Sequence, residues 1–340
     1  MTGRRRYVII GGGAVGGALA AQLGPASRTG GYDVVLVARG DHGRLVSADG
    51  LRVRRPSGVE VVELDVASGP DEVRLQPGDV LLLTVKTQDA EAALSEWAWQ
   101  PVYDERGAEV GSATELPIVT LQNGLLTEDL ALRRFRHVYG ATVAIAASYL
   151  TPGEIVSPSL PPAVGGIWLG RHPGGRDAVQ ELVVRDLVAA GFAAWSVDDI
   201  TAQKAAKLAG NVGNGLDLLT GSEELKVRAR AELRAEALDV IAAAGLPLPP
   251  GGSLDFHGVE FQVLPVDGHV PGRLSTWQSF ARGASSEVDY LNGEVVLLAR
   301  RSGREAPLNE RLQQLLGSPH HADRRTVEAL VAPGRDDVAV

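Results

Sequence analysis

A glycine cluster behind a short apolar run is the feature that most constrains this chain. Residues 7–10 are apolar and β-prone, and residues 14–23 are rich in alanine and leucine, which predicts a strand, a tight turn and a helix. Gly11, Gly13 and Gly16 match the spacing G-x-G-x-x-G. The first would permit the turn, the second would admit a pyrophosphate because it lacks a Cβ atom, and the third would let the helix pack on the strand. We therefore predict a dinucleotide site at the helix N-terminus.

The residues after this turn indicate which dinucleotide binds. Residues 33–38 read as a second buried strand, as a β-α-β unit requires. The strand is followed by Arg39 rather than by an acidic residue, and a guanidinium suits the 2′-phosphate of NADP. We therefore predict NADP(H), with a solvated surface arginine as the alternative for Arg39. The predicted contacts in the turn are Gly11, Gly12, Gly13, Ala14, Val15 and Gly16.

Composition excludes several other classes of protein. The 340 residues suffice for two domains, and 44% hydrophobic with 22% charged residues is ordinary for a soluble globular chain. A net charge of −9 disfavours nucleic-acid binding, and the lack of cysteine excludes thiol catalysis and thiolate metal sites. No apolar run reaches the length of about 18 residues that a membrane span needs. We therefore expect a cytoplasmic enzyme with a small-molecule substrate and without a metal, and the sequence is compatible with a homodimer.

The pattern of strands and helices divides the chain near Asp198. Before it, strand-like runs alternate with helical segments, which is the order of an α/β domain with a parallel sheet. After it, helical periodicity covers residues 200–219, 222–244, 275–302 and 308–316. We expect a Rossmann-type domain over residues 1–198, a helical domain over 199–318 and a loosely ordered tail over 319–340.

Two polar residues stand at the carboxyl ends of predicted strands in the first domain. Lys86 ends the run 78–86, and Asn123 ends the run 117–123. Ligands of open α/β sheets bind at that edge, so Lys86 would add positive charge to the cofactor site and Asn123 would bind the nicotinamide or its ribose. The alternatives are a surface lysine and a left-handed turn residue before a glycine, respectively.

A polar stripe marks the first helix predicted in the second domain. Lys207, Asn211 and Asn214 are spaced i, i+4 and i+7, which places them on one helical face. Asparagines are poor helix formers, so their presence indicates that the side chains are used. Lys204 lies one turn earlier on nearly the same face and is the competing lysine.

Four motifs in this order resemble the ketopantoate reductase family, also called 2-dehydropantoate 2-reductases. They are the Gly11–Gly16 turn, Gln122-Asn123-Gly124, Lys207-Leu-x-x-Asn211, and Ser275 followed by Glu287-Val-Asp-Tyr-Leu-Asn-Gly. The resemblance extends from residue 7 to about 316. It implies an N-terminal Rossmann domain and an all-α C-terminal domain like that of 6-phosphogluconate dehydrogenase. It also implies NADPH-dependent reduction of ketopantoate to pantoate, a precursor of pantothenate and coenzyme A.

The resemblance further implies roles for individual residues. It places the catalytic lysine on Lys207, the catalytic acidic residue on Glu287, and substrate contacts on Asn211 and on Ser275, which would bind the carboxylate. We assign Asn214 to the substrate as well. The residues that fall where the family contacts the cofactor are Arg39, Lys86 and Asn123, and we place Glu287 near the cofactor too. Without the resemblance, Ser275 reads as a helix N-cap and Glu287 as a surface acid.

The chain departs from the family pattern at the substrate end. The family has a second asparagine four residues after the first, whereas Asn214 follows Asn211 by three. The acidic residue that the family carries four residues after its serine is replaced by Ser279. The predicted substrate is therefore ketopantoate or, alternatively, another keto acid or carbonyl compound. A further alternative is an NADP-binding protein without catalytic activity.

Overall fold

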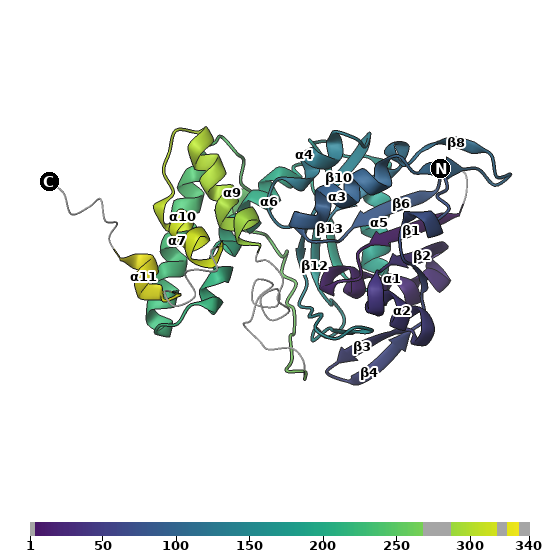
Figure 1. Cartoon of the computed structure of the whole chain (residues 1–340), viewed down its shortest axis with the longest axis horizontal. Helices are drawn as coiled ribbons and strands as arrows, with labels where there is room; N and C mark the ends of the chain where they lie inside the picture. The colour runs from purple at the N-terminus through teal and green to yellow at the C-terminus, as the bar shows by residue number, and fades with distance from the viewer. Residues whose placement is uncertain (1–3, 268–286, 318–324, 333–340) are drawn as a thin grey trace. The chain divides into compact units, whose positions relative to one another are not determined.

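The computed structural model describes residues 4–267, 287–317 and 325–332, and these divide into two compact units (Figure 1). The first unit contains the described residues up to Gln122, then Leu126–Gln203, and the segment that begins at Asp255. The second contains Asn123–Leu125, Lys204–Leu254 and the described residues from Glu287 onward. Neither unit is continuous in sequence. The expected boundary near Asp198 stays a prediction.

The first unit is built around an eight-stranded sheet. Its strands are β1 (Arg5–Ile10), β2 (Tyr32–Val37), β5 (Asp65–Ala67), β6 (Asp79–Leu83), β9 (Pro117–Thr120), β10 (His137–Ala144), β12 (Gly166–His172) and β13 (Ala193–Ser196). They are ordered β13-β12-β10-β9-β6-β1-β2-β5, and every pair is parallel except β10 with β12. The run β5-β2-β1-β6-β9-β10 is the doubly wound order of a Rossmann domain. The predicted fold class is confirmed.

Helices and smaller strands complete this unit. The helices are α1 (Ala14–Gly30), α2 (Gly40–Asp49), α3 (Thr87–Ala98), α4 (Thr127–Leu132) and α5 (Ala178–Ala189), with 3-10 turns at Pro70–Glu72 and Ala113–Glu115. The alternating runs around Pro56-Ser-Gly58, which are typical of a hairpin, form β3 (Leu51–Arg55) and β4 (Gly58–Val62). These two strands pair antiparallel, and β11 (Glu154–Val156) joins β3. A second hairpin pairs β7 (Pro101–Tyr103) with β8 (Glu109–Ser112).

The apolar runs of the strands are explained by burial on both faces of the sheet. Along β1, Tyr7 and Ile9 pack in one hydrophobic cluster with residues of α1 and α5. Val8 and Ile10 point to the opposite face and pack with residues of α3 and α4. A parallel strand covered on both sides has no polar face, which is why the sequence shows continuous apolar runs rather than alternation.

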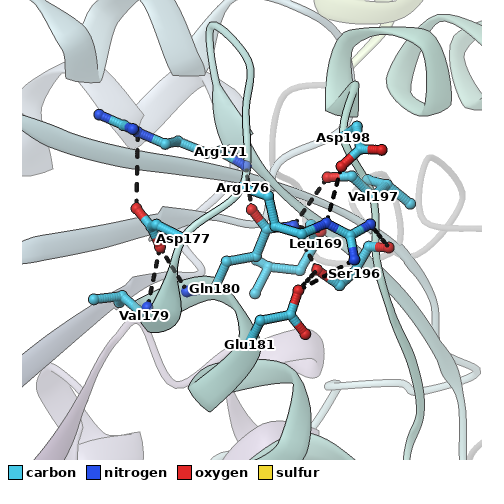
Figure 2. Close-up of polar contacts among 10 residues, drawn as sticks. All are labelled: Leu169, Arg171, Arg176, Asp177, Val179, Gln180, Glu181, Ser196, Val197 and Asp198. Carbon is cyan, nitrogen blue, oxygen red and sulfur yellow. Dashed lines mark hydrogen bonds and ion pairs between the residues drawn. The ribbon is translucent and has the colours of Figure 1, made fainter.

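Gln180 of α5 is buried and forms hydrogen bonds with β12, with β13 and with the residue that follows β13 (Figure 2). The Gln180 side chain is completely buried, and its Oε1 atom accepts a hydrogen bond from the Arg171 N–H at 3.0 Å. Its Nε2 atom lies 2.6 Å from Ser196 Oγ and 2.9 and 3.2 Å from the carbonyl oxygens of Val197 and Leu169. The network holds the segment after β13, which leads directly into the next helix.

We expect Gln180→Leu to lower the free energy of unfolding by about 2–4 kcal/mol, because each buried polar group left unpaired costs about 1–3 kcal/mol. Thermal and urea unfolding of the purified protein would measure the loss. The control is Arg176→Ala, which removes partly exposed contacts to Glu181 and Asp198 in the same network (Figure 2) and should cost no more than about 1 kcal/mol. Equal losses in the two variants would contradict a special role for Gln180.

The second unit is helical. Its helices are α6 (Ile200–Asn211), α7 (Glu223–Ala243), α9 (Val288–Arg301), α10 (Pro307–Gly317) and α11 (Val327–Val331), with 3-10 turns at Asn214–Leu218 and Pro250–Gly252. Only the part of α6 from Lys204 onward belongs to this unit. Its core is a single cluster of apolar residues from these helices. In Figure 1, α9, α10 and α11 carry the yellow-green to yellow end of the colour scale. Among the described helices, none has the length and apolarity to cross a membrane.

Two sequence predictions for this unit are wrong. The helix expected to run to Leu219 ends at Asn211, and a 3-10 turn starts at Asn214. Gly210 and Gly213 lower the helical preference of this segment. In addition, a Cβ atom on Gly213 would stand only 2.8 Å from Arg230 Cγ of α7, so close packing against α7 favours glycine where the helix ends. The expected loose tail is wrong for residues 325–332, because α11 buries Val327 and its Thr326 cap accepts a backbone hydrogen bond.

Candidate active site

The glycine turn between β1 and α1 has the shape that a dinucleotide requires. Gly11 has a φ of 118°, and a Cβ atom on it would stand 2.9 Å from the Val85 nitrogen. A Cβ atom on Gly16 would stand 1.8 Å from the Gly11 carbonyl oxygen. In contrast, a Cβ atom on Gly13 would meet no atom within 4 Å. The first and third glycines are therefore needed for packing, whereas the second leaves open space before the helix.

The N-terminus of α1 provides the charge that a pyrophosphate needs. Gly13 is the N-cap residue, Ala14 begins the helix, and the first turn contains no acidic side chain. The first N–H groups of a helix have no acceptor within the helix, and the helix dipole is positive at this end. The residues present therefore fit the phosphates of a dinucleotide.

Two residues to which sequence reasoning gave no role hold this turn in place; Gln122 appeared only as part of the motif Gln122-Asn123-Gly124. Thr84 Oγ1 donates a hydrogen bond to the Gly11 carbonyl oxygen at 2.7 Å. Gln122 Nε2 donates to the carbonyl oxygen of Val85 at 2.8 Å, and Val85 is the residue against which Gly11 packs. Both side chains follow apolar strands. Their position just beyond the strand ends was the only signal for Thr84, whereas Gln122 also belonged to a quoted motif.

His42 is a third residue that the sequence did not reveal. Its ring is buried against Gly12, where an added Cβ atom would stand 2.9 Å from the imidazole. Nδ1 accepts a hydrogen bond from the Gly153 N–H at 2.9 Å, so the proton of the neutral ring lies on Nε2. Burial lowers the pKa of His42 below its ordinary value. The ring is therefore neutral at pH 7 and supports the turn by packing.

Arg39 and Lys86 lie in the same unit as the glycine turn. Arg39 directly follows β2 as the N-cap of α2, and Lys86 follows β6 as the N-cap of α3. The Arg39 side chain is 65% exposed and forms an ion pair with Glu96 of α3. An exposed pair of this kind contributes at most about 1 kcal/mol. The guanidinium is therefore accessible to an anionic ligand.

In the second unit, the structure brings together two predicted site residues that are far apart in sequence. Asn211 Nδ2, at the end of α6, donates a hydrogen bond to Asn123 Oδ1 at 3.2 Å. The next residue, Gly124, has a φ of 83°, and a Cβ atom on it would stand 2.7 Å from the Tyr290 carbonyl oxygen of α9. The segment 123–125 therefore packs on both α6 and α9. This contact turns the Asn211 Nδ2 atom toward Asn123.

Lys207 differs from the competing lysine in its surroundings. Lys204 is only 2% exposed, so its amine has little access to a ligand. Lys207 lies one turn before Asn211, and part of the residue is exposed although its amine is largely desolvated. Burial lowers the pKa of Lys207 to about 8, because desolvation disfavours the charged form. An amine with a pKa near neutrality is suited to proton transfer.

The remaining predicted site residues are placed as follows. Asn214 is buried at the start of a 3-10 turn, so it does not continue the helical face of Lys207 and Asn211. Glu287 is buried at the N-cap of α9. Ser275, assigned to the substrate carboxylate, lies outside the described residues.

Comparison with known proteins identifies the family. The family described as "Ketopantoate reductase PanE/ApbA" matches residues 7–174, and "Ketopantoate reductase PanE/ApbA C terminal" matches residues 199–319. The chain belongs to the ketopantoate reductase family. The resemblance drawn from the motifs is confirmed, as is the prediction of an NADP-dependent oxidoreductase.

Individual relatives agree with this assignment. A 2-dehydropantoate 2-reductase of Mesorhizobium japonicum is 28% identical over 333 residues, which cover 89% of this chain and 94% of that protein. The crystal structure of a PanE/ApbA family ketopantoate reductase from Ralstonia eutropha JMP134 has a TM-score of 0.71 at 24% identity, covering 94% and 99% of the two chains. D-mandelate dehydrogenase with NADH and anilino(oxo)acetate has the same TM-score and coverage at 19% identity. The two solved structures show that the fold is shared.

Proposed function

We propose that this member of the ketopantoate reductase family reduces ketopantoate to pantoate with NADPH in the cytoplasm. In this proposal residues 1–198 bind the cofactor and residues 199–318 bind the substrate. Lys207 carries the proposal, because its pKa is lowered to about 8 and it precedes Asn211 by one helical turn. The relatives named 2-dehydropantoate 2-reductase support the substrate. The exposed Arg39 guanidinium supports NADPH over NADH.

Reduction of a 2-keto acid needs a hydride at the carbonyl carbon and a proton at the carbonyl oxygen, which becomes the hydroxyl. NADPH supplies the hydride when it is bound. The Lys207 ammonium donates a hydrogen bond to the keto oxygen, stabilises the negative charge that develops there, and transfers its proton. The neutral amine then regains a proton from water. A pKa of about 8 suits this step, because the Lys207 amine can both donate and regain a proton near neutral pH.

Other side chains orient the substrate. The Asn211 amide binds the oxygen atoms of the keto acid, and Asn123 holds that amide in one orientation by accepting its N–H. Ser275 binds the carboxylate. Glu287 positions the lysine ammonium or the product hydroxyl. These groups restrict the keto acid to a reactive orientation, which is a large part of the rate gain that enzymes achieve.

We expect kcat/KM for reduction to be constant below pH about 8 and to fall about tenfold per pH unit above it, because Lys207 is protonated only below its pKa. For the reverse reaction, oxidation of the hydroxy acid, the neutral amine is the active form and kcat/KM should rise through the same pH. Stopped-flow or steady-state measurements over pH 6–10 would check both. The dissociation constant of NADPH, measured over the same range, is the control. Parallel pH profiles in the two directions would contradict proton donation by Lys207.

The substrate is tested by following NADPH absorbance in the presence of ketopantoate. A panel of other keto acids, including the keto acid of mandelate, distinguishes the second candidate, a reductase of the same fold with another substrate. Ser279 in place of an acidic residue favours that candidate. A higher kcat/KM for another keto acid than for ketopantoate would replace the proposed substrate. NADPH binding without oxidation by any of these compounds would indicate a protein that binds NADP without catalysis.

A further inference from the structure

A chain of buried hydrogen bonds crosses the helical unit and reaches the end of α6. Asn292 of α9 is 2% exposed and Asn309 of α10 is completely buried. Asn292 Nδ2 lies 2.9 Å from Asn309 Oδ1 and 2.9 Å from the Val212 carbonyl oxygen. Val212 is the residue that follows α6. The network therefore links a residue of α9 to the backbone beside Asn211.

The far end of the network sets the orientation of each amide. Glu236 of α7 accepts hydrogen bonds from the backbone N–H groups of Leu308 and Asn309 at 3.0 and 2.8 Å. It also accepts from Asn309 Nδ2 at 2.8 Å. Because a carboxylate only accepts, Asn309 must turn its nitrogen toward Glu236 and its oxygen toward Asn292. Asn292 then presents an N–H to the Asn309 oxygen and its other N–H to the Val212 carbonyl.

The Val212 carbonyl lies just beyond the last residue of α6 and accepts a hydrogen bond from the distant residue Asn292. The last carbonyl groups of a helix have no donor within the helix. Gly210 and Gly213 on either side lower the helical preference of the segment. A tertiary contact must therefore decide where the helix stops and how Asn211, its last residue, is directed.

We propose that Asn292 is a positioning residue, which fixes the last turn of α6 through the Val212 carbonyl and thereby aims the Asn211 amide at the substrate. The inference rests on the proposed function, since it gives Asn211 a substrate to bind. The motif that starts at Glu287 contains Asn292, and the inference gives this asparagine a role, which the sequence alone did not. Helix α9 supports the partner of Asn211 as well, because its Tyr290 carbonyl lies against Gly124 next to Asn123.

The test compares Asn292→Leu with Asn309→Leu. Both substitutions keep the approximate side-chain volume and break the network, but only Asn292→Leu removes the donor to Val212. We expect Asn292→Leu to lower kcat/KM for the keto acid by about 10- to 100-fold, since small misplacements at an active site have effects of this size. The dissociation constant of NADPH should change by less than about twofold, because the glycine turn is untouched. Asn309→Leu should lose similar stability with a much smaller loss of kcat/KM.

A second readout does not depend on turnover. The side-chain amide resonances of Asn211, assigned by their loss in Asn211→Ala, should shift in Asn292→Leu and stay nearly in place in Asn309→Leu. If Asn292→Leu does not fold, both kcat/KM and the Asn211 resonances are measured in Asn292→Ser instead. This variant keeps one hydrogen-bond donor, so a smaller change is expected in both. Equal losses of activity and equal resonance shifts in the Asn292 and Asn309 variants would show a merely structural role and overturn the inference. Failure of the wild-type protein to reduce any keto acid would overturn the proposed function alone, since the resonance comparison would still stand.

Discussion

Replacing Lys207 with alanine should lower kcat for keto-acid reduction by about 100- to 10,000-fold, the range typical of losing a general acid. The alkoxide that forms at the keto oxygen would lose both its proton donor and the charge of the ammonium. NADPH affinity should change by less than about twofold, because the substitution leaves the glycine turn and Arg39 intact. Single-turnover kinetics and fluorescence titration would measure the two quantities separately. The break in the pH profile at about 8 should disappear with the side chain.

The matched control is Lys204→Met, one helical turn earlier. Lys204 is buried, so this variant should lose stability more than kcat. An added small amine such as methylamine should restore part of the activity of Lys207→Ala by supplying the missing acid, and it should not affect Lys204→Met. Full turnover in Lys207→Ala, together with loss of turnover in Lys204→Met, would move the role of proton donor to Lys204.

Replacing Arg39 with alanine should weaken NADPH binding by about 10- to 150-fold, because hydrogen bonds between charged groups contribute about 1.5–3 kcal/mol. NADH lacks the 2′-phosphate, so its affinity should change by less than about twofold. Dissociation constants for both cofactors, taken at low and at moderate ionic strength, would check the difference. The loss of NADPH affinity in Arg39→Ala should be smaller at the higher ionic strength, because the Arg39 side chain is exposed and its charge is screened by salt.

Two neighbours of Arg39 serve as controls. Arg44 of α2 is exposed like Arg39 and pairs with Asp41. Arg44→Ala therefore removes the same charge and should weaken NADPH binding much less. Glu96 forms an ion pair with Arg39 and would compete with a phosphate for it. Glu96→Gln should therefore leave NADPH affinity unchanged or raise it slightly. Equal losses of NADPH and NADH affinity in Arg39→Ala would contradict recognition of the 2′-phosphate.

The glycine turn and the doubly wound sheet could be predicted because both are encoded locally. Gly16 is required by a steric contact with Gly11 five residues earlier, and the positive φ of Gly11 itself favours glycine, although Gly11 also packs against Val85 beyond β6, the neighbouring strand of the sheet. The apolar runs are long enough to identify buried strands, and the parallel order follows from the alternation of strands and helices. Membership of the ketopantoate reductase family was predicted from four short motifs, one of which is the glycine turn, and was confirmed.

The sequence by itself determined the class of cofactor site, the Rossmann architecture and the placement of Lys207 and Asn211 one turn apart on α6. Tertiary structure alone decided that α6 stops at Asn211, that Asn123 meets that residue across 88 positions of chain, and that α11 packs into the helical core. The physical reason is that weak local preferences, such as those around Gly210 and Gly213, leave the outcome to long-range packing and to buried hydrogen bonds. Such contacts join residues whose spacing in the sequence carries no periodic signal.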